Sequence, residues 1–212
     1  MKKNGAQKNT QKRQAYHHGD VAQQLLAVSE QIIIKKGVEA FSLREAAEIV
    51  GVSPSACYRH YKNKLEILKN LASRGLFKLY EYQIKALKKN DGCSCEEEIF
   101  VLALAYLQFA QKYPAYFKIM FAPLGVDSRD PSLALGFVAG KGPYGMLLDS
   151  VDRWLKKNSI KKNPGTCAVE IWAAVHGMTC LVLNGSIRDE VRKTNSENLL
   201  QGIIKTILSG FH

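Results

Sequence analysis

Long apolar segments and a cysteine framework are both missing from this chain of 212 residues. Its most apolar stretch, Ala168 to Leu183, is interrupted by Glu170 and His176 and falls short of the length that a bilayer span needs. The basic N-terminus is not followed by the apolar core of a signal peptide. The five cysteines are an odd number without disulfide-scaffold spacing, which is typical of a reducing compartment. We therefore expect a cytoplasmic protein with no membrane partner.

Sequence signatures of catalysis are missing as well. There is no Gly-rich phosphate-binding loop, no nucleophile elbow and no convincing pair of carboxylates. His176 and Cys180 stand one helical turn apart, but no further ligands follow at metal-site spacing, and structural zinc usually needs four. The sequence therefore predicts no enzyme, no cofactor and no metal ion. The alternative in this class is an enzyme with an aromatic-lined helical pocket, which turnover of a substrate would reveal.

Acidic residues are scarce relative to basic ones. The chain holds 30 Lys and Arg against 19 Asp and Glu, which gives a formal net charge of +11. Residues 1–64 carry +6 of this charge, so the basic character is densest at the N-terminal end. Such an excess favours nucleic acid or an anionic surface as a partner, without choosing between them.

Strand-like alternation, internal repeats and low-complexity tracts are not found either. Hydrophobic residues make up 46% of the chain, which is enough for a core. These residues recur at helical spacing, so the sequence predicts an all-α fold. The expected helices cover about 20–36, 42–50, 54–61, 64–88, 94–113, 114–121, 131–157 (one or two helices), 166–184 and 196–210.

Local signals divide the chain. Ser42 to Glu45 has the form of a capping box, and Ser53-Pro54 supplies an N-cap followed by a helix-compatible proline. The polar loop from Lys88 to Cys93 suits a domain boundary, and Ser94 with Glu97 caps the next helix. The predicted parts are a flexible basic arm (1–19), a helix-turn-helix DNA-binding domain (20–64), a linking helix (65–89) and a larger helical domain (90–212).

The helices over 42–50 and 54–61 are joined by a three-residue turn that starts at Gly51. This is helix-turn-helix spacing, in which the second helix enters the major groove. Short capped helices joined by a Gly turn also occur in proteins that bind no DNA, but the hydrogen-bonding outer face favours DNA. Arg59 can address a guanine edge. The candidate DNA-binding residues are Arg44, Ser53, Ser55, Tyr58, Arg59, His60, Lys62 and Lys64.

The segment FSLREAAEIVGVSPSACYRHYKNK, Phe41 to Lys64, resembles the helix-turn-helix of the TetR family of repressors. YHHGD at 16–20 resembles the lead-in to the first helix of many members, so the resemblance covers about residues 16–68. It implies that Tyr58 and Lys64 hold DNA phosphates and that His60 often does the same. Family members usually carry a larger apolar residue in place of Cys57, so we expect looser packing under the recognition helix.

The C-terminal part carries a second resemblance. Tyr113 to Phe121 and Trp172 to Gly177 look like the WHG-type C-terminal domain of one TetR subgroup. This implies that residues 90–212 form the ligand-binding and dimerisation domain. The helices over 166–184 and 196–210 are apolar over wide faces, and paired across a two-fold axis they would form the four-helix interface of a homodimer.

Aromatic and soft side chains are concentrated in this domain. In most proteins such residues are core, but in a family that binds small molecules between helices some of them should line a cavity. His176 either orients a ligand or bonds a neighbour, and Gly177 is expected to permit close helix approach. The candidate ligand-binding residues are Tyr106, Phe109, Phe117, Met120, Phe121, Trp172 and His176.

These patterns predict a TetR-like homodimeric repressor that a small, largely apolar inducer releases from double-stranded operator DNA. The rival is an architectural DNA-binding protein that senses no ligand and shows little sequence preference. Activation in place of repression stays open, because the same DNA contacts serve both. Cys93 and Cys95 are either a redox pair or part of a solvated loop.

Overall fold

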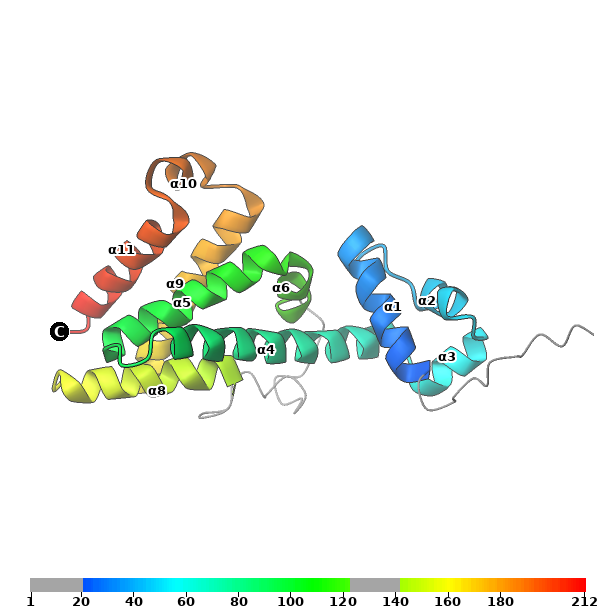
Figure 1. Ribbon diagram of the computed structural model, residues 1–212, viewed down its shortest axis with the longest axis horizontal. Helices are drawn as coiled ribbons and strands as arrows, with labels where there is room; N and C mark the ends of the chain where they lie inside the picture. The colour runs from blue at the N-terminus through cyan, green and yellow to red at the C-terminus, as the bar shows by residue number, and fades with distance from the viewer. Residues whose placement is uncertain (1–20, 123–141) are drawn as a thin grey trace, which may run out of the picture.

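The computed structural model describes residues 21–122 and 142–212, and every regular element in this part of the chain is a helix (Figure 1). The all-α prediction is confirmed. The helices are α1 (Val21–Lys36), α2 (Leu43–Val50), α3 (Pro54–His60), α4 (Lys64–Lys89), α5 (Cys95–Lys112), α6 (Pro114–Met120), α8 (Gly142–Lys157), α9 (Pro164–Asn184), α10 (Arg188–Thr194) and α11 (Ser196–Ser209). Residues 1–20, which include the predicted arm over 1–19, and residues 123–141 lie outside the described residues.

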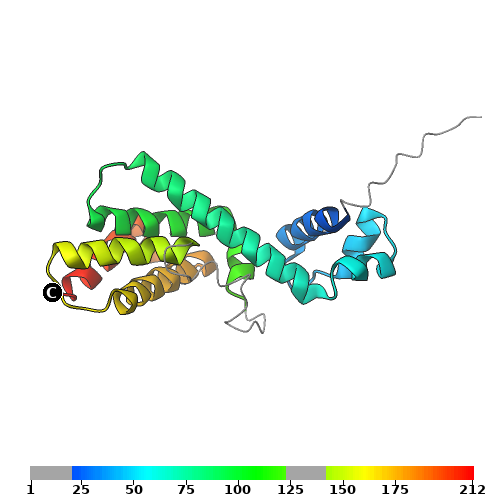
Figure 2. The same ribbon diagram turned by 90° about the horizontal axis from the view of Figure 1, so that it is seen from below.

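The molecule is elongated, with α1, α2 and α3 at one end and the C-terminus at the other (Figure 1). Buried side chains form two hydrophobic clusters. The head cluster joins α1, α2 and α3 to the first turns of α4, from Ile67 to Ala72. The body cluster joins Leu79 of α4 to α5, α8, α9 and α11. Helix α4 therefore belongs to both clusters, and Figure 2 shows it running from one end of the molecule into the other.

Short-range capping explains the head helices. The Ser42 hydroxyl accepts the Glu45 N–H and begins α2, and Gly51 ends it in the left-handed region at φ 79°. Of the two hydrogen bonds of the capping box expected at Ser42 to Glu45, the one from the Glu45 N–H to the Ser42 hydroxyl is formed. The Glu45 carboxylate instead accepts a hydrogen bond from Lys36 Nζ at 2.6 Å. The Ser53 hydroxyl accepts the Ala56 N–H and begins α3.

Helix α4 is capped by Asn63, whose side chain accepts the Glu66 N–H. A side-chain contact ties α4 to the head, because Arg74 donates to Gln23 Oε1 at 2.5 Å and lies 3.8 Å from the Glu30 carboxylate. These contacts join the middle of α4 to α1. The head is thus held to α4 by both apolar packing and polar contacts.

The body is a bundle in which α5 packs against α4, α8 and α9, and α11 packs against α9 and α5. The capping box predicted at Ser94 and Glu97 is formed on both sides and begins α5. Ile99, Leu102 and Phe109 of α5 are buried at the centre of the bundle. Their burial fixes α5 as the central helix of the body.

One boundary and one additional helix in the body differ from the sequence prediction. Helix α9 begins at Pro164 and not at residue 166, because the Asn163 side chain caps the Thr166 N–H and the proline fits the first turn. Helix α10 was not predicted. It is short, has no buried residue and has no side-chain cap, so it leaves no apolar period in the sequence.

Helix α9 also corrects an expectation about length. Among the described residues, Pro164–Asn184 is one helix of 21 residues that is long and apolar enough to cross a bilayer by length and composition alone. The core helix of a soluble bundle passes the same test, and α9 packs against α5, α8 and α11. Its apolar character therefore has an explanation in the body cluster.

Candidate functional site

Two buried contacts hold α3 against the rest of the head. The Tyr61 hydroxyl donates a hydrogen bond of 3.0 Å to the Ala22 carbonyl of α1. Cys57 is buried, its thiol lies 3.9 Å from the Leu43 carbonyl, and burial raises its pKa. The cysteine therefore packs under α3 as an unreactive side chain, and Tyr61 fixes the end of the helix.

The outer face of α3 is exposed and carries hydrogen-bonding groups. Tyr58 is 54% exposed, and Arg59 and His60 beside it are exposed as well. Ser53 and Ser55 are exposed at the start of the helix, with their hydroxyl oxygens 2.9 Å apart. No acidic residue occurs between Ser53 and Lys64. This surface offers donors and positive charge, and a carboxylate reaches its edge where Glu66 Oε2 accepts the Lys62 N–H at 2.7 Å.

Three further candidate residues surround α3. Lys62 is exposed. Arg44 is exposed on α2 and forms a salt bridge of 3.1 Å with Glu48, so part of its charge is neutralised. Lys64 is half-buried, with its Nζ 3.3 Å from the Glu39 carbonyl oxygen and 5.7 Å above the Phe41 ring. A phosphate contact by Lys64 would therefore replace a contact that it makes within the head.

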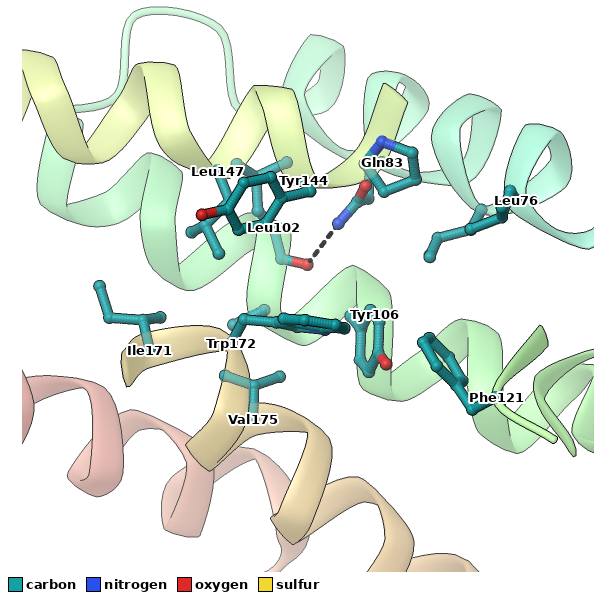
Figure 3. Close-up of a pocket in the computed structure, with 13 residues that line it drawn as sticks. Leu76, Gln83, Leu102, Tyr106, Phe121, Tyr144, Leu147, Ile171, Trp172 and Val175 are labelled. Carbon is teal, nitrogen blue, oxygen red and sulfur yellow. Dashed lines mark hydrogen bonds between the residues drawn. The ribbon is translucent and has the colours of Figure 1, made fainter. Parts of the chain in front are cut away.

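A cavity lies in the body between α4, α5, α8 and α9 (Figure 3). Its empty volume is about 510 Å³, counting the part open to solvent. None of the described residues that line it carries a charge. The lining consists of Leu76, Leu79, Gln83, Leu102, Ala103, Tyr106, Phe121, Pro143, Tyr144, Leu147, Ile171, Trp172 and Val175. A mostly apolar wall with a few polar groups is typical of small-molecule sites.

Only some of the seven candidate ligand-binding residues line the cavity. Tyr106, Phe121 and Trp172 line the cavity, whereas the other four lie outside its lining. Phe109 is fully buried in the core, against Tyr82 and Tyr113. Of the remaining three, Phe117 stacks on His176 with ring centroids 5.5 Å apart, and Met120 packs on Gly75 of α4. Phe117 and His176 contact the lining residues Tyr106 and Phe121, and so support the cavity wall from behind.

Sequence reasoning missed the contributions of α4 and α8. Leu76, Leu79 and Gln83 of α4 line the cavity, and so do Tyr144 and Leu147 of α8. Helix α4 was interpreted as a linking helix only, and α8 lies in the range 131–157, for which the sequence left one or two helices open. A signal was present in α4, because Gln83 follows Leu76 and Leu79 on the same helical face and is a polar residue in an apolar stripe.

A chain of polar contacts runs from the cavity wall along α9. The Tyr106 hydroxyl lies 2.8 Å from His176 Nδ1, and His176 Nε2 lies 3.6 Å from Cys180 Sγ. Burial lowers the pKa of His176, so its ring is neutral, and burial raises the pKa of Tyr106, so its hydroxyl keeps the proton. Tyr106 therefore donates to Nδ1, and His176 donates from Nε2 to the thiol.

Two other features of the sequence are Cys93-Ser94-Cys95 and Gly177. Cys93 and Cys95 are free and half-buried, and burial with nearby Glu98 and Glu97 raises the pKa of Cys93, which opposes thiolate formation.

Gly177 was expected to permit a close approach between helices, but a Cβ there would meet nothing within 4 Å in the protomer. The space beside Gly177 is open.

Two family profiles match the chain. Residues 25–71 match the profile described as bacterial regulatory proteins, tetR family, and residues 99–206 match the tetracyclin repressor-like C-terminal domain. The chain belongs to the tetR family. The C-terminal match does not confirm the WHG-type subgroup.

Two curated relatives each match a part of the chain. It is 29% identical over 94 residues to the uncharacterised HTH-type transcriptional regulator YobS of Bacillus subtilis, a match that covers 44% of this chain and 48% of YobS. It is 31% identical over 64 residues to the HTH-type transcriptional repressor BepR of Brucella suis, covering 30% of this chain and 31% of BepR. The chain thus spans about half the length of the first relative and less of the second.

Solved structures match nearly the whole fold. A protein with unknown function from Rhodococcus sp. RHA1 superimposes with a TM-score of 0.74 at 22% identity, covering 93% of this chain and 98% of that one. The TetR family regulator PfmR from Thermus thermophilus gives a TM-score of 0.60 at 17% identity, covering 88% and 97%. At this identity the likeness establishes the shared fold.

Proposed function

We propose that this TetR-family transcriptional regulator binds operator DNA as a homodimer through α3 and releases it when a small, largely apolar ligand occupies the body cavity. The observation that carries the proposal is the double role of α4. Ile67 and Leu71 of α4 are buried in the head cluster, and Leu76 and Leu79 of the same helix line the cavity. A ligand that moves α4 therefore moves the head.

Helix α6 supplies a second connection between the two clusters. Ile119 is buried in the head cluster, whereas Phe117 is buried in the body cluster. The two residues lie within one turn of α6. Phe121, at the end of α6, lines the cavity and packs edge-to-face on His176 with centroids 4.6 Å apart. A ligand that displaces Phe121 is thus coupled to head packing through α6 as well as α4.

The DNA-binding role is assigned to the exposed face of α3. Tyr58, His60 and Lys62 are proposed to contact phosphates together with Lys64, whereas Arg59 is proposed to read a base edge. Phosphate contacts position the protein without specifying sequence, and base contacts specify it. Arg44, Ser53 and Ser55 complete the proposed surface at the start of the recognition helix.

The dimer interface is proposed to lie on α9 and α11, with α9 as its centre. An exposed stripe of α9 runs through Val169, Ala173, Gly177 and Leu181, and these positions recur at helical spacing. Val169 and Leu181 are 48% and 43% exposed, and the open space at Gly177 leaves room for a partner helix. The exposed positions of α11 other than Gly202 are polar, so they suit the rim of such an interface.

The proposed parts follow from these roles: a DNA-binding domain over 20–64, a linking helix over 65–89 and a ligand-binding and dimerisation domain over 90–212. The energetic limit on the mechanism is general. Ligand binding can lower DNA affinity only by the factor by which the ligand prefers the DNA-free arrangement. A compound that binds both arrangements equally would stabilise the protein and leave its DNA affinity unchanged.

The test combines ligand screening with DNA release. Neutral aromatic compounds are screened for thermal stabilisation of the protein, and each stabilising compound is then added to a complex with a fluorescent operator duplex. We expect stabilising compounds to lower operator affinity, and Ala103→Phe, which fills the cavity from α5, to lose the stabilisation. Compounds that stabilise the protein by binding in the cavity but leave operator affinity unchanged would favour the architectural DNA-binding protein.

A further inference from the structure

The cavity wall contains a buried hydrogen-bond acceptor for which the described part of the chain supplies no donor. The Gln83 side chain is only 4% exposed, and its Nε2 donates a hydrogen bond of 3.2 Å to the Leu102 carbonyl (Figure 3). Its Oε1 is buried, and no donor of the described residues lies within hydrogen-bond distance of it. Buried polar atoms are almost always paired, so an acceptor left unpaired among the described residues of a cavity wall marks a position where a ligand can donate a hydrogen bond.

The orientation of the Gln83 amide follows from its partner. A backbone carbonyl oxygen can only accept a hydrogen bond, so the nitrogen of the amide must face Leu102. Turning the amide over would place two acceptor oxygens against each other and would leave the –NH₂ group unpaired. The unpaired atom is therefore the oxygen, which is an acceptor only.

The other polar side chains of the cavity are already engaged with each other or with backbone. The Tyr144 hydroxyl donates to the Gly165 carbonyl at 3.3 Å. The Tyr106 hydroxyl bonds His176 Nδ1 at 2.8 Å, and the indole N–H of Trp172 bonds the same hydroxyl group. These donors are thus used within the wall, and Gln83 Oε1 remains as the acceptor that a ligand can satisfy.

We infer that the ligand of this cavity is a neutral, largely apolar molecule that carries a hydrogen-bond donor, a hydroxyl or N–H group, and that Gln83 Oε1 accepts this donor. The inference rests on the proposed function for the existence of a ligand and adds its chemical class. Neutrality follows because none of the described lining residues is charged, and an ion without a counter-charge is costly to bury. The requirement for a donor follows because Gln83 Oε1 is an unpaired acceptor.

The position of Gln83 gives this hydrogen bond a structural consequence. Gln83 lies on α4 one turn beyond Leu79, on the helix that continues into the head cluster. A ligand that donates to Gln83 is attached directly to the helix that carries the DNA-binding end. A ligand of the same shape without a donor would fill the cavity but would leave Oε1 unpaired.

The test uses pairs of neutral compounds that differ in the donor. Indole is compared with benzofuran, and 2-naphthol with 2-methoxynaphthalene, by isothermal titration calorimetry on the protein without DNA. Leaving a buried acceptor unpaired should weaken binding by about tenfold, so each donor compound should bind about ten times more tightly than its acceptor-only partner. The same four titrations are repeated on Gln83→Met and Gln108→Met.

Gln108→Met is the matched control, because Gln108 is exposed on α5 and does not line the cavity. The donor preference should persist in Gln108→Met and disappear in Gln83→Met, where both members of a pair should bind equally. Equal binding of both members to the wild-type protein overturns the inference, as does failure of both donor compounds to bind saturably. The wild-type comparison holds even if Gln83→Met folds poorly.

The outcome is separable from that of the proposed function. Donor preference is measured without DNA, whereas the proposed function requires release of operator DNA. Donor compounds that bind through Gln83 but never release DNA would contradict the proposed function and support the inference. Compounds that release DNA but show no donor preference in binding would support the proposed function and contradict the inference.

Discussion

Met120 of α6 lies directly against Gly75 of α4, so that a Cβ added at Gly75 would fall 2.7 Å from Met120 Sδ and 3.0 Å from Tyr116 Cδ1. The absence of a side chain at Gly75 thus sets the separation of α4 and α6 at the point between the head and body clusters. Both helices connect the cavity with the DNA-binding end, so this contact should influence the coupling between them.

A double-mutant cycle tests the contact. Gly75→Ala gains about 1 kcal/mol of helix propensity, but crowding against Met120 costs about 1–3 kcal/mol. The free energy of unfolding should therefore stay the same or fall in Gly75→Ala. In a Met120→Ala protein the same change should raise it by at most about 1 kcal/mol, because the close contact with Tyr116 Cδ1 remains. Urea unfolding of the four proteins gives the coupling. Additive effects would show that the two side chains do not compete for this space.

The Tyr61 hydroxyl should stabilise the head. Tyr61→Phe removes its hydrogen bond to the Ala22 carbonyl, and we expect the free energy of unfolding to fall by about 1 kcal/mol. Tyr58→Phe is the matched control, since Tyr58 is exposed on the outer face of α3. This control should unfold like the wild type in urea and bind duplex DNA more weakly. Loss of stability in Tyr58→Phe but not in Tyr61→Phe would reverse the two assignments.

Local features were predictable from the sequence because their causes are local. Ser42, Ser53 and Ser94 cap the helices that they were predicted to cap, since a cap involves groups within one helical turn. The exposed face of α3 was predictable for the same reason, because helical spacing decides which side chains of a short helix point outward. By contrast, the second half of the Ser42 box was predicted wrongly, because Lys36 from another helix takes the Glu45 carboxylate.

The cavity was less predictable because it depends on contacts distant in sequence. Aromatic residues of α5, α6 and α9 were identified by type, but type does not separate Phe109, which is core, from Phe121, which lines the cavity. Gln83 gained its role only when α4 was placed beside α5 and α8. Packing against distant helices decides between a core residue and a cavity residue.

His176 should make stability depend on pH. Its pKa in the folded protein is lowered by burial from the ordinary value of 6.5, so below that pH the unfolded chain binds more protons than the folded one. The stability of the wild type should fall, relative to His176→Gln, as the pH drops through about 6.5. Urea unfolding of both proteins at pH 8 and pH 5 measures the difference between their free energies of unfolding. The contributions of the other titrating groups are the same in both proteins and cancel in this difference. A difference that is constant with pH would contradict the burial of a neutral His176.

The dimer proposal needs a substitution on an exposed face. Ile204 is 2% exposed within the protomer, so Ile204→Glu would disrupt the core and is unsuitable as an interface test. Val169→Glu and Leu181→Glu should instead give folded monomers by analytical ultracentrifugation, with operator affinity lowered by tenfold or more. Gln108→Glu, exposed on α5, should remain dimeric. Variants of Val169 and Leu181 that still sediment as dimers would place the interface elsewhere.

Lys64 should contribute a phosphate contact that is independent of sequence. Lys64→Ala should weaken binding to all duplexes about equally and reduce the slope of log affinity against log salt by about 1. Fluorescence anisotropy in a salt titration measures both quantities. Because Lys64 also contacts the Glu39 carbonyl, circular dichroism must show that the variant is folded. An unchanged affinity and slope would remove Lys64 from the DNA-binding surface.

The most direct test of the central claim is selection of binding sites from a random duplex library by the wild-type protein and by Arg59→Ala. The account predicts that the wild type enriches an inverted repeat whose half-sites are centred about one DNA turn apart, roughly 10 base pairs, because two α3 helices of a symmetric dimer enter successive major grooves. Arg59→Ala should lose the preference at one position of each half-site. Enrichment of no motif by the wild-type protein would contradict the claim that this chain is a sequence-specific regulator.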